Sequence, residues 1–330
     1  MTKKQTAVFL STAIFLIIST ILSLSLGAAN LSLSQLWQAI SNGPSSTAGY
    51  IFWYARLPRT AACLLSGMAL AVSGCVIQSV LGNKLASPGI IGVNAGAGLS
   101  VTICCALGML SGWTISLCSF SGAMLSVFFV VFLARKTGAS RTTVILCGVA
   151  LNSILNAFTE AIIALIPEVG MLSSDFRVGG FSSVVSSRLL PAGILILIAL
   201  CILLTFANDL DILGLGEDTA QSLGLSVKKM RTLFLILAAL LAGASVSFAG
   251  LLGFVGLLVP HAARKLIGTE SRFLLPLCAI GGAGFVTICD LASRLLFRPY
   301  ELHTGILISL LGGPFFLLLL LTKKGGHHHD

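Results

Sequence analysis

The residues with the clearest chemical potential lie at a helical spacing inside an apolar stretch. Asn152, Asn156 and Glu160 occupy positions i, i+4 and i+8, so a helix over 142–166 would place them along one face. Two amides and a carboxyl group are costly in an apolar environment, which predicts that they face a polar cavity or a neighbouring helix. Both alternatives stay open, because hydrogen bonds between helices use the same residue types.

A second carboxyl group inside an apolar stretch belongs to Asp290. It has the chemistry of a proton relay, but Arg294 follows one helical turn later, and a local ion pair is the simpler interpretation. A proton carrier at Glu160 or Asp290 would be typical of an ion-coupled secondary transporter, which is the main alternative function for this chain.

Catalytic motifs are missing from the sequence. There is no G-x-x-x-x-G-K-[ST] loop for ATP phosphates, no H-E-x-x-H, and no G-x-S-x-G elbow with partnering His and Asp. His261 and His303 are the only histidines outside the terminal tract, and the nine cysteines lie in apolar stretches without metal-ligand spacing. We therefore predict no catalytic residue, no metal site and no cofactor in this chain, which argues against an intramembrane enzyme.

The composition shows what kind of structure must position these residues. Of the 330 residues, 56% are hydrophobic and 9% are charged, against about 25% charged in an ordinary soluble domain. This excludes a soluble globule, and the recurring apolar runs predict an all-α integral membrane protein with a bundle of ten transmembrane helices. The expected spans are 5–27, 57–81, 91–110, 112–134, 142–166, 189–207, 229–249, 251–267, 273–296 and 302–322.

The basic residues predict the orientation of the bundle. With the N-terminus in the cytoplasm, fourteen Lys and Arg lie inside and six lie outside, so the positive-inside rule places both termini in the cytoplasm. The six outside residues are Arg56, Arg59, Arg177, Arg188, Arg294 and Arg298. Because the basic residues are scattered over short loops, the net charge of +9 reports orientation and does not indicate nucleic-acid binding.

The ends of the chain allow two further predictions. Residues 1–324 are expected to form one ten-span transmembrane domain, and 325–330, which contain three histidines, are expected to be a tag remnant or a solvated tail. The first span is favoured as a retained helix over a signal peptide cleaved near Gly27-Ala28-Ala29. Residues 31–41 fit a short amphipathic helix at the outer interface, with Trp37 at headgroup depth.

The longest predicted cytoplasmic connection, 208–231, contains an amphiphilic segment. Residues 215–224 predict one short helix that Gly224 ends, with Glu217 and Asp218 in the first turn, where carboxylates complement the helix dipole. Leu215, Ala220 and Leu223 are expected to be exposed on the cytoplasmic side. No soluble domain is present to cover them, which favours a docking element for a partner over a solvated loop.

Seven sequence segments together resemble a known family. The chain is similar to the ten-span permease subunits of type II ABC importers, the FecCD-type family that carries ferric siderophores, haem or vitamin B12. The resemblance covers nearly the whole chain. Its segments, in family order, are Arg56-Leu57-Pro58-Arg59; Gly67 to Gly74 with Gln78; Asn83 to Ala97; the 215–224 helix; Gly250 to Arg264; Asp290 to Arg294; and Glu301 to Phe316 with Gly313-Pro314-Phe315.

The resemblance implies contact sites for two kinds of partner. It identifies the segment at about 212–226 as a coupling helix that seats in an ATP-binding subunit, with the contact made by Leu215, Gly216, Glu217, Asp218, Ala220, Leu223 and Gly224. ATP and Mg would then be held by that partner. It also implies that Arg56, Arg59 and Arg294 face outward and pair with acidic residues of an extracytoplasmic substrate-binding protein. Lipid phosphate is the alternative partner for these arginines.

The resemblance further implies a path and a gate. Asn152, Asn156 and Glu160 would line the translocation path, together with His303 near its outer mouth. Residues of a cytoplasmic gate would be Asn83, Leu85, Thr142 and Thr143. Two positions depart from the family pattern, since Lys84 and His303 both stand where proline is usual.

The expected function is that of a transport subunit in the bacterial cytoplasmic (inner) membrane. Two copies, or this chain and a close paralogue, would surround a central path, with two ATP-binding subunits on one side and a binding protein on the other. Membrane lipid is the remaining partner, and no nucleic acid is expected. A ferric siderophore is the first choice of cargo because it is the commonest family substrate, with haem or vitamin B12 as alternatives.

Overall fold

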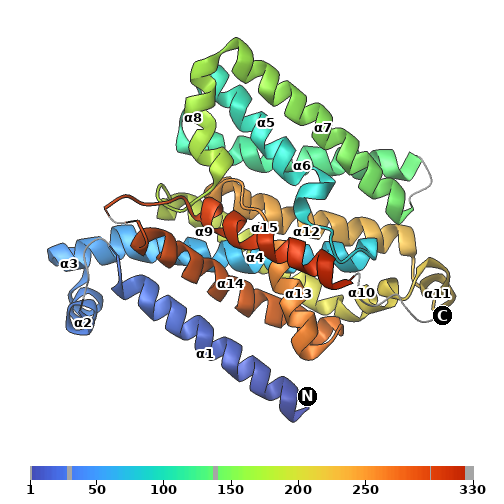
Figure 1. Ribbon diagram of the computed structural model, residues 1–330, viewed down its shortest axis with the longest axis horizontal. Coiled ribbons are helices and arrows are strands. Elements are labelled where there is room, and N and C mark those ends of the chain that lie inside the picture. Colours follow the sequence, from blue (N-terminus) through green and yellow to red (C-terminus); the bar gives the residue numbers. More distant parts are fainter. Residues whose placement is uncertain (1, 28–31, 137–139, 298, 324–330) are drawn as a thin grey trace.

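The computed structural model describes residues 2–27, 32–136, 140–297 and 299–323, and over these ranges the chain is helical with no strand (Figure 1). Ala28, Ala29, Arg298 and the tail 325–330 lie outside the described residues. The α-helices are α1 (Lys3–Ser25), α2 (Leu33–Asn42), α3 (Thr47–Tyr50), α4 (Leu57–Leu81), α5 (Val93–Ala106), α6 (Gly112–Lys136), α7 (Arg141–Leu165), α8 (Pro167–Val178), α9 (Ser186–Thr205), α10 (Ala207–Gly214), α11 (Glu217–Ser222), α12 (Val227–Ala249), α13 (Val255–Ile267), α14 (Ser271–Leu295) and α15 (Thr304–Lys323). Short 3-10 or π turns are η1 (Gly43–Ser45), η2 (Ile51–Arg56) and η3 (Pro88–Ile91).

The all-helical membrane fold is confirmed. Among the described residues, seven helical segments are long and apolar enough to cross a membrane, and α5 and α15 are shorter apolar helices. A helix lies in each of the ten expected segments, while the count of ten spans and the side of the termini stay predictions. The expected helix over 31–41 is present as α2, where Ser32 accepts a hydrogen bond from the Gln35 N–H and Trp37 is 71% exposed.

Two expected segments differ from the structure in a way that matters for the site. The segment 251–267 becomes helical only at Val255. Residues 250–254 are not helical, and Phe254 has a φ of 60°, in the left-handed region. After α7 the chain does not leave the bundle directly. Pro167 occupies the first position of α8, a helix that sequence periodicity did not predict and that turns back beside α7.

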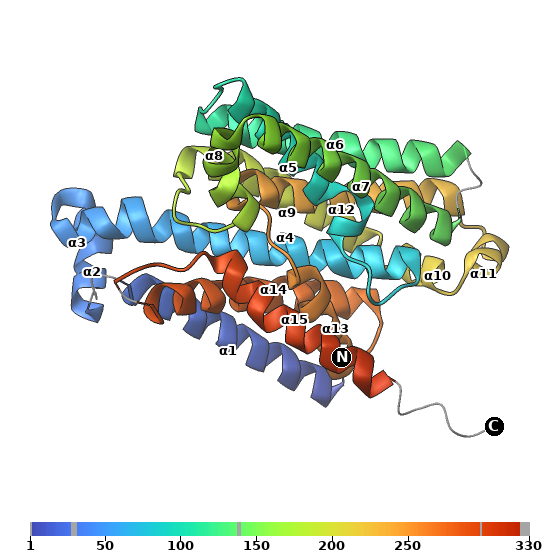
Figure 2. The same cartoon turned by 45° about the horizontal axis from the view of Figure 1, so that its top comes forward.

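Helix α4 forms the centre of the bundle. Both views place α5 to α8 on one side of α4 and α1 and α14 on the other (Figures 1 and 2). Glycine makes the close approach between α4 and α14 possible, since a Cβ on Gly67 or Gly282 would overlap the backbone of the opposite helix. Following the predicted orientation, the end of the bundle with α2 and α3 is called the outer end, and the end with α10 and α11 the cytoplasmic end.

Candidate functional site

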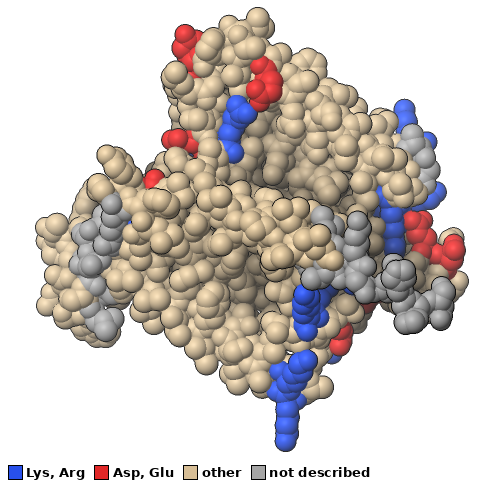
Figure 3. All heavy atoms as spheres, viewed as in Figure 1, with Lys and Arg blue, Asp and Glu red and all other residues tan. Residues whose placement is uncertain are grey.

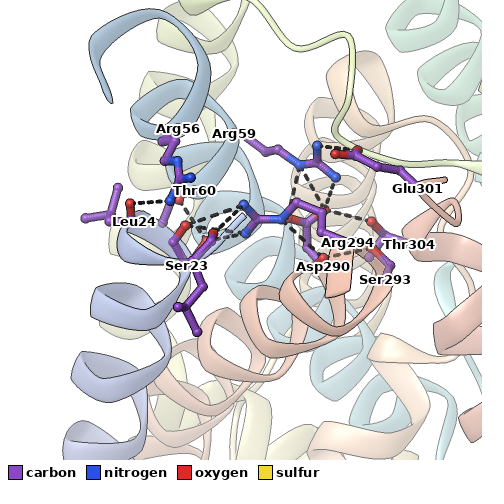
Figure 4. Close-up of polar contacts among 11 residues, drawn as sticks. Ser23, Leu24, Arg56, Arg59, Thr60, Asp290, Ser293, Arg294, Glu301 and Thr304 are labelled. Atoms are coloured by element: carbon purple, nitrogen blue, oxygen red, sulfur yellow. Dashed lines mark hydrogen bonds and ion pairs between the residues drawn. The ribbon is translucent and has the colours of Figure 1, made fainter. Parts of the chain in front are cut away.

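A buried cluster of charges joins α4 and α14 at the outer end (Figure 4). The Asp290 side chain is fully buried, and its two oxygens lie 3.0 Å from Arg59 Nη2 and 3.1 Å from Arg294 Nε. The Thr304 hydroxyl donates to Asp290 Oδ1 at 2.9 Å. The expected local ion pair with Arg294 is therefore present. Two guanidinium groups and a hydroxyl compensate this buried carboxylate, as a structural ion pair requires.

The same cluster attaches two further segments to the bundle. Arg59 Nη1 lies 2.8 Å from Glu301 Oε2, in the segment that leads into α15. Arg294 Nη2 donates to the Ser23 hydroxyl at 2.9 Å, and Arg56 Nη1 donates to the Leu24 carbonyl at 2.8 Å. These bonds tie the outer end of α1 and the start of α15 to the central helices.

The prediction that all three arginines face outward is wrong for two of them. Arg56 is 5% exposed and Arg294 is 6% exposed, because each meets carbonyl, hydroxyl or carboxylate groups of this chain. Of the three, Arg59 has the most accessible side chain, at 15%, and it stands between Asp290 and Glu301. The role of these arginines in docking stays a prediction.

A polar cavity of about 550 Å³ runs along α7. Asn152, Asn156 and Glu160 all line it, as residues on one helix face can, while Asn152 also bonds a neighbouring segment; the role of the three in a translocation path stays a prediction. The other lining residues come from the η3–α5 region and from the segments around α7, α8 and α13; they are Gly89, Asn94, Ala95, Gly98, Thr159, Arg177 and Leu251.

Hydrogen bonds fix two of the three polar side chains on α7. The Asn152 amide donates to the Gly89 carbonyl at 2.8 Å, while its buried Oδ1 has no hydrogen-bond partner among the described residues. Glu160 Oε1 lies 2.8 Å from Arg177 Nη2, which α8 brings back toward α7. The Asn152 amide is thus used within the chain, and the cavity offers the Asn156 amide and the Glu160–Arg177 ion pair, groups that bind polar organic ligands.

His303 lies away from this cavity. Its Nε2 is 3.4 Å from Asp175 Oδ1 on α8, and it borders a pocket of about 30 Å³ with Arg59 and Glu301. The structure thus brings three of the four expected path residues together and leaves His303 at the outer surface, where it joins α8 to the segment before α15.

The expected gate residues lie in two turns that the structure brings to the same end. Gly82 ends α4 in the left-handed region, and Asn83 Oδ1 accepts a hydrogen bond from the Leu85 N–H at 2.9 Å. Thr142 and Thr143 form the first turn of α7. The neighbouring Arg141 donates to the Leu213 carbonyl of α10 at 2.7 Å, and its side chain lies against Gly82.

Sequence reasoning assigned no role to Phe254 or His261, which share a small pocket with Leu85 and Lys84. The Phe254 ring lies against Gly312 of α15, and the His261 ring contacts Phe315 edge-on with centroids 6.0 Å apart. The sequence held one signal for the unusual turn at Phe254, namely the nearby Gly253 and Gly256. The sequence analysis used this segment only as part of the family resemblance. Lys84 itself is exposed, so this departure from the family pattern adds a surface charge near the gate.

The helix in the coupling segment, α11, is shorter than the predicted helix over 215–224. α11 begins at Glu217, with Asp218 also in its first turn, and Leu215 and Gly216 form the preceding turn. Gly224 has a φ of 83°, as expected for a residue that ends the helix. Arg231 of α12 pairs with Glu217 at 2.5 Å and holds α11 against the bundle.

The exposure of the coupling segment is predicted correctly for two of its three apolar residues. Leu215 is 64% exposed and Leu223 is 61% exposed, whereas Ala220 is fully buried. The expectation that Ala220 is exposed is therefore wrong. Because α11 rests on its neighbours through one face, the small residue is covered and the two leucines flank the free surface.

Comparison with known proteins identifies the family that shares this architecture. The model of the FecCD transport family matches residues 15–322. The chain belongs to the FecCD transport family. The uncharacterized ABC transporter permease protein YvrB of Bacillus subtilis (strain 168) is 36% identical over 321 residues, which cover 91% of this chain and 89% of YvrB. The vitamin B12 import system permease protein BtuC of Salmonella paratyphi A is 36% identical over 310 residues, 92% of each chain.

Solved structures agree with this membership. A transporter assigned to the metal-chelate type of ABC transporter, solved in an inward-facing conformation, has a TM-score of 0.85 and 27% identity, and the match covers 96% of this chain and 99% of that one. PsaBC from Streptococcus pneumoniae in complex with Fab shares the fold, with a TM-score of 0.57 at 16% identity. The FecCD-family chain is a permease of an ABC importer and a multi-pass protein of the inner membrane. An ion-coupled carrier is therefore set aside.

Proposed function

We propose that this permease moves an iron chelate from an extracytoplasmic binding protein to the cytoplasm through the cavity on α7. A ferric siderophore is the first choice, and haem or vitamin B12 are the alternatives. The polar cavity supports the proposal most strongly. It offers amide groups and an ion pair, and no group of three or more metal-ligating side chains occurs among the described residues. Such a lining suits a cargo whose metal is already coordinated by its own chelator.

The surface of α7 supports a second copy, or a paralogue, as the element that completes the path. Few α7 residues are buried within this chain, and besides the polar stripe α7 exposes apolar side chains, among them Leu146, Ile154 and Phe158. Apolar residues around a polar cavity would seal it from lipid when two such faces meet. The cavity would then lie between the two permease chains.

The two ends of the bundle carry the surfaces at which we expect partners outside the membrane to bind. Two ATP-binding subunits would contact the α11 segments through Leu215 and Leu223, and these subunits would hold ATP and Mg. A binding protein would dock at the outer end. Because Arg56 and Arg294 are buried, Arg59 with Glu301 is the proposed point of charge contact there. This chain would supply the path and the gates, without a catalytic site of its own.

An uptake assay with a variant of the cavity tests this proposal. In proteoliposomes containing the full complex, Asn156→Leu removes an amide from the cavity wall and is expected to lower uptake of a ferric siderophore by about 5- to 150-fold. A desolvated polar group of the cargo then loses its partner, at a cost of about 1–3 kcal/mol. Leu197→Asn, at a residue that is exposed on α9 and lies outside both the cavity lining and the α7 face, is the control. Unchanged uptake by Asn156→Leu would remove the cavity from the path.

A further inference from the structure

An apolar groove of about 440 Å³ lies between α1, α13, α14 and α15, away from the α7 cavity. This volume falls in the range of sites that hold small ligands. Apolar side chains form its walls, among them Leu258, Leu266, Phe285 and Phe315. Thr12 lines it too, but its hydroxyl donates to the Val8 carbonyl of its own helix at 2.8 Å. The surface that Thr12 offers to the groove is therefore its methyl group.

The absence of a side chain at Gly281 leaves this groove open. A Cβ at Gly281 would have only ordinary contacts, 3.7 Å from Thr12 Cγ2 and 3.7 Å from Val259 Cγ1. The next residue, Gly282, differs, because close helix packing against Gly67 leaves no room for a side chain there. The space above Gly281 is thus available to a flexible apolar group rather than consumed by a neighbouring helix.

Two basic residues lie in the turns at the cytoplasmic ends of the groove helices α13 and α14. Lys265 precedes the groove residue Leu266 in the last turn of α13, and Arg272 lies in the first turn of α14. Neither has an ion-pair partner within the described part of the chain. Arg264 is different, since it turns inward and donates to the Gln78 side chain. Two carboxylates also lie near these residues: Glu270, just before α14, and Asp211 of α10, which accepts hydrogen bonds from the N–H and hydroxyl of Ser271.

The start of α1 adds charge of the same sign. Lys3 and Lys4 are exposed at the first turn of the helix whose Thr12 lines the groove. In Figure 3, basic side chains stand at the lower edge of the molecule, where Figure 1 places the N-terminus. An apolar groove with basic side chains toward its cytoplasmic end is complementary in polarity and charge to an anionic lipid.

We propose that this groove binds one anionic phospholipid of the bilayer. An acyl chain lies along Gly281 between α1 and α13, and the headgroup phosphate pairs with Lys265 and Arg272. Both side chains have long apolar stems that reach along the helix end while the charge stays at headgroup depth. The bound lipid fills the gap between peripheral α1 and the α13–α14 pair. This site is separate from the cargo path and does not depend on which chelate is carried.

Lipid retention by the purified full-length chain tests the proposal. The chain in detergent is mixed with phosphatidylglycerol or phosphatidylcholine, and the retained lipid is counted by native mass spectrometry. The wild-type chain is expected to retain one phosphatidylglycerol in preference to phosphatidylcholine. Removing the charges with Lys265→Gln and Arg272→Gln should lower phosphatidylglycerol retention about fivefold per residue, because each basic group near the surface contributes on the order of 1 kcal/mol.

Two further variants separate a built site from general attraction to basic protein. Gly281→Leu fills the groove and should abolish the retained phosphatidylglycerol while helical content stays that of the wild type. Lys136→Gln removes a charge at the end of α6, away from the groove, and should change nothing. Equal retention by the wild type and Gly281→Leu, equal retention of both lipids, or the same loss in Lys136→Gln would overturn the proposal. Should Gly281→Leu fail to fold, the two charge variants decide.

Discussion

At the scale of single residues, the two ion pairs of Arg59 illustrate how burial determines the contribution of an ion pair to stability. On one side lies Asp290, fully buried and shared with Arg294; on the other lies Glu301, whose side chain is 42% exposed. A buried carboxylate with two guanidinium partners cannot be removed without leaving unpaired charge in a low-dielectric interior. An exposed partner is replaced by water at little cost.

This contrast gives a prediction for Asp290→Asn. The variant keeps the size of the side chain but leaves two buried guanidinium groups without a counter-charge, so the free energy of unfolding should fall by about 3–5 kcal/mol. The matched variant Glu301→Gln should change it by about 1 kcal/mol or less. Denaturant titration in detergent measures both. Equal losses in the two variants would show that burial of Asp290 does not govern this cluster.

At the scale of helices, glycines determine which elements touch. Gly67 and Gly282 let the α4 and α14 backbones meet, whereas a Cβ on the adjacent Gly281 would make only ordinary van der Waals contacts. Gly282→Ala is expected to destabilise the chain by about 1–3 kcal/mol through overpacking. Gly281→Ala should be neutral or stabilising, because alanine favours helix by about 1 kcal/mol. Thermal unfolding of the two variants gives the comparison, and a Gly281→Ala loss as large as that of Gly282→Ala would contradict this packing.

The coupling segment gives a prediction about a partner. Replacing the two exposed leucines, Leu215→Asp with Leu223→Asp, should abolish co-purification of the ATP-binding subunit while leaving the helical content unchanged. Leu296→Asp is the control, because Leu296 is likewise 64% exposed but lies at the other end of the bundle. If the double variant still binds the subunit as the wild type does, the α11 surface is not the contact.

Much of the element pattern was predictable, and the exceptions have physical causes. Long apolar runs predicted ten membrane segments, and a helix lies in each of them. The i, i+4, i+8 spacing predicted that Asn152, Asn156 and Glu160 share one helix face, and all three line the same cavity. α8 was missed because Pro167 redirects a chain that is polar enough to read as a loop. The burial of Arg56 and Arg294 was missed because Arg56 bonds to the Leu24 carbonyl and Arg294 to the Ser23 hydroxyl, both at the end of α1. Sequence spacing reports only the pairing of Arg294 with Asp290 in its own helix.

At the scale of the whole molecule, α4 separates two faces whose surfaces differ in polarity. The α7 face carries the polar cavity and exposed apolar side chains that suit a second permease copy. The α1 face carries the apolar groove and basic end that suit a lipid. The proposed coupling segment and the expected gate residues lie at one end, and the charged cluster ties α1, α4, α14 and the start of α15 at the other. Such an arrangement lets partners at the two ends bias one conformational equilibrium.

The most direct test of the central claim is cargo uptake into proteoliposomes that contain this chain, its ATP-binding subunits and its binding protein. The account predicts that uptake of a ferric siderophore requires ATP and continues at the same rate when an uncoupler collapses the proton gradient. Uptake that persists without the ATP-binding subunits and follows the proton gradient would contradict it.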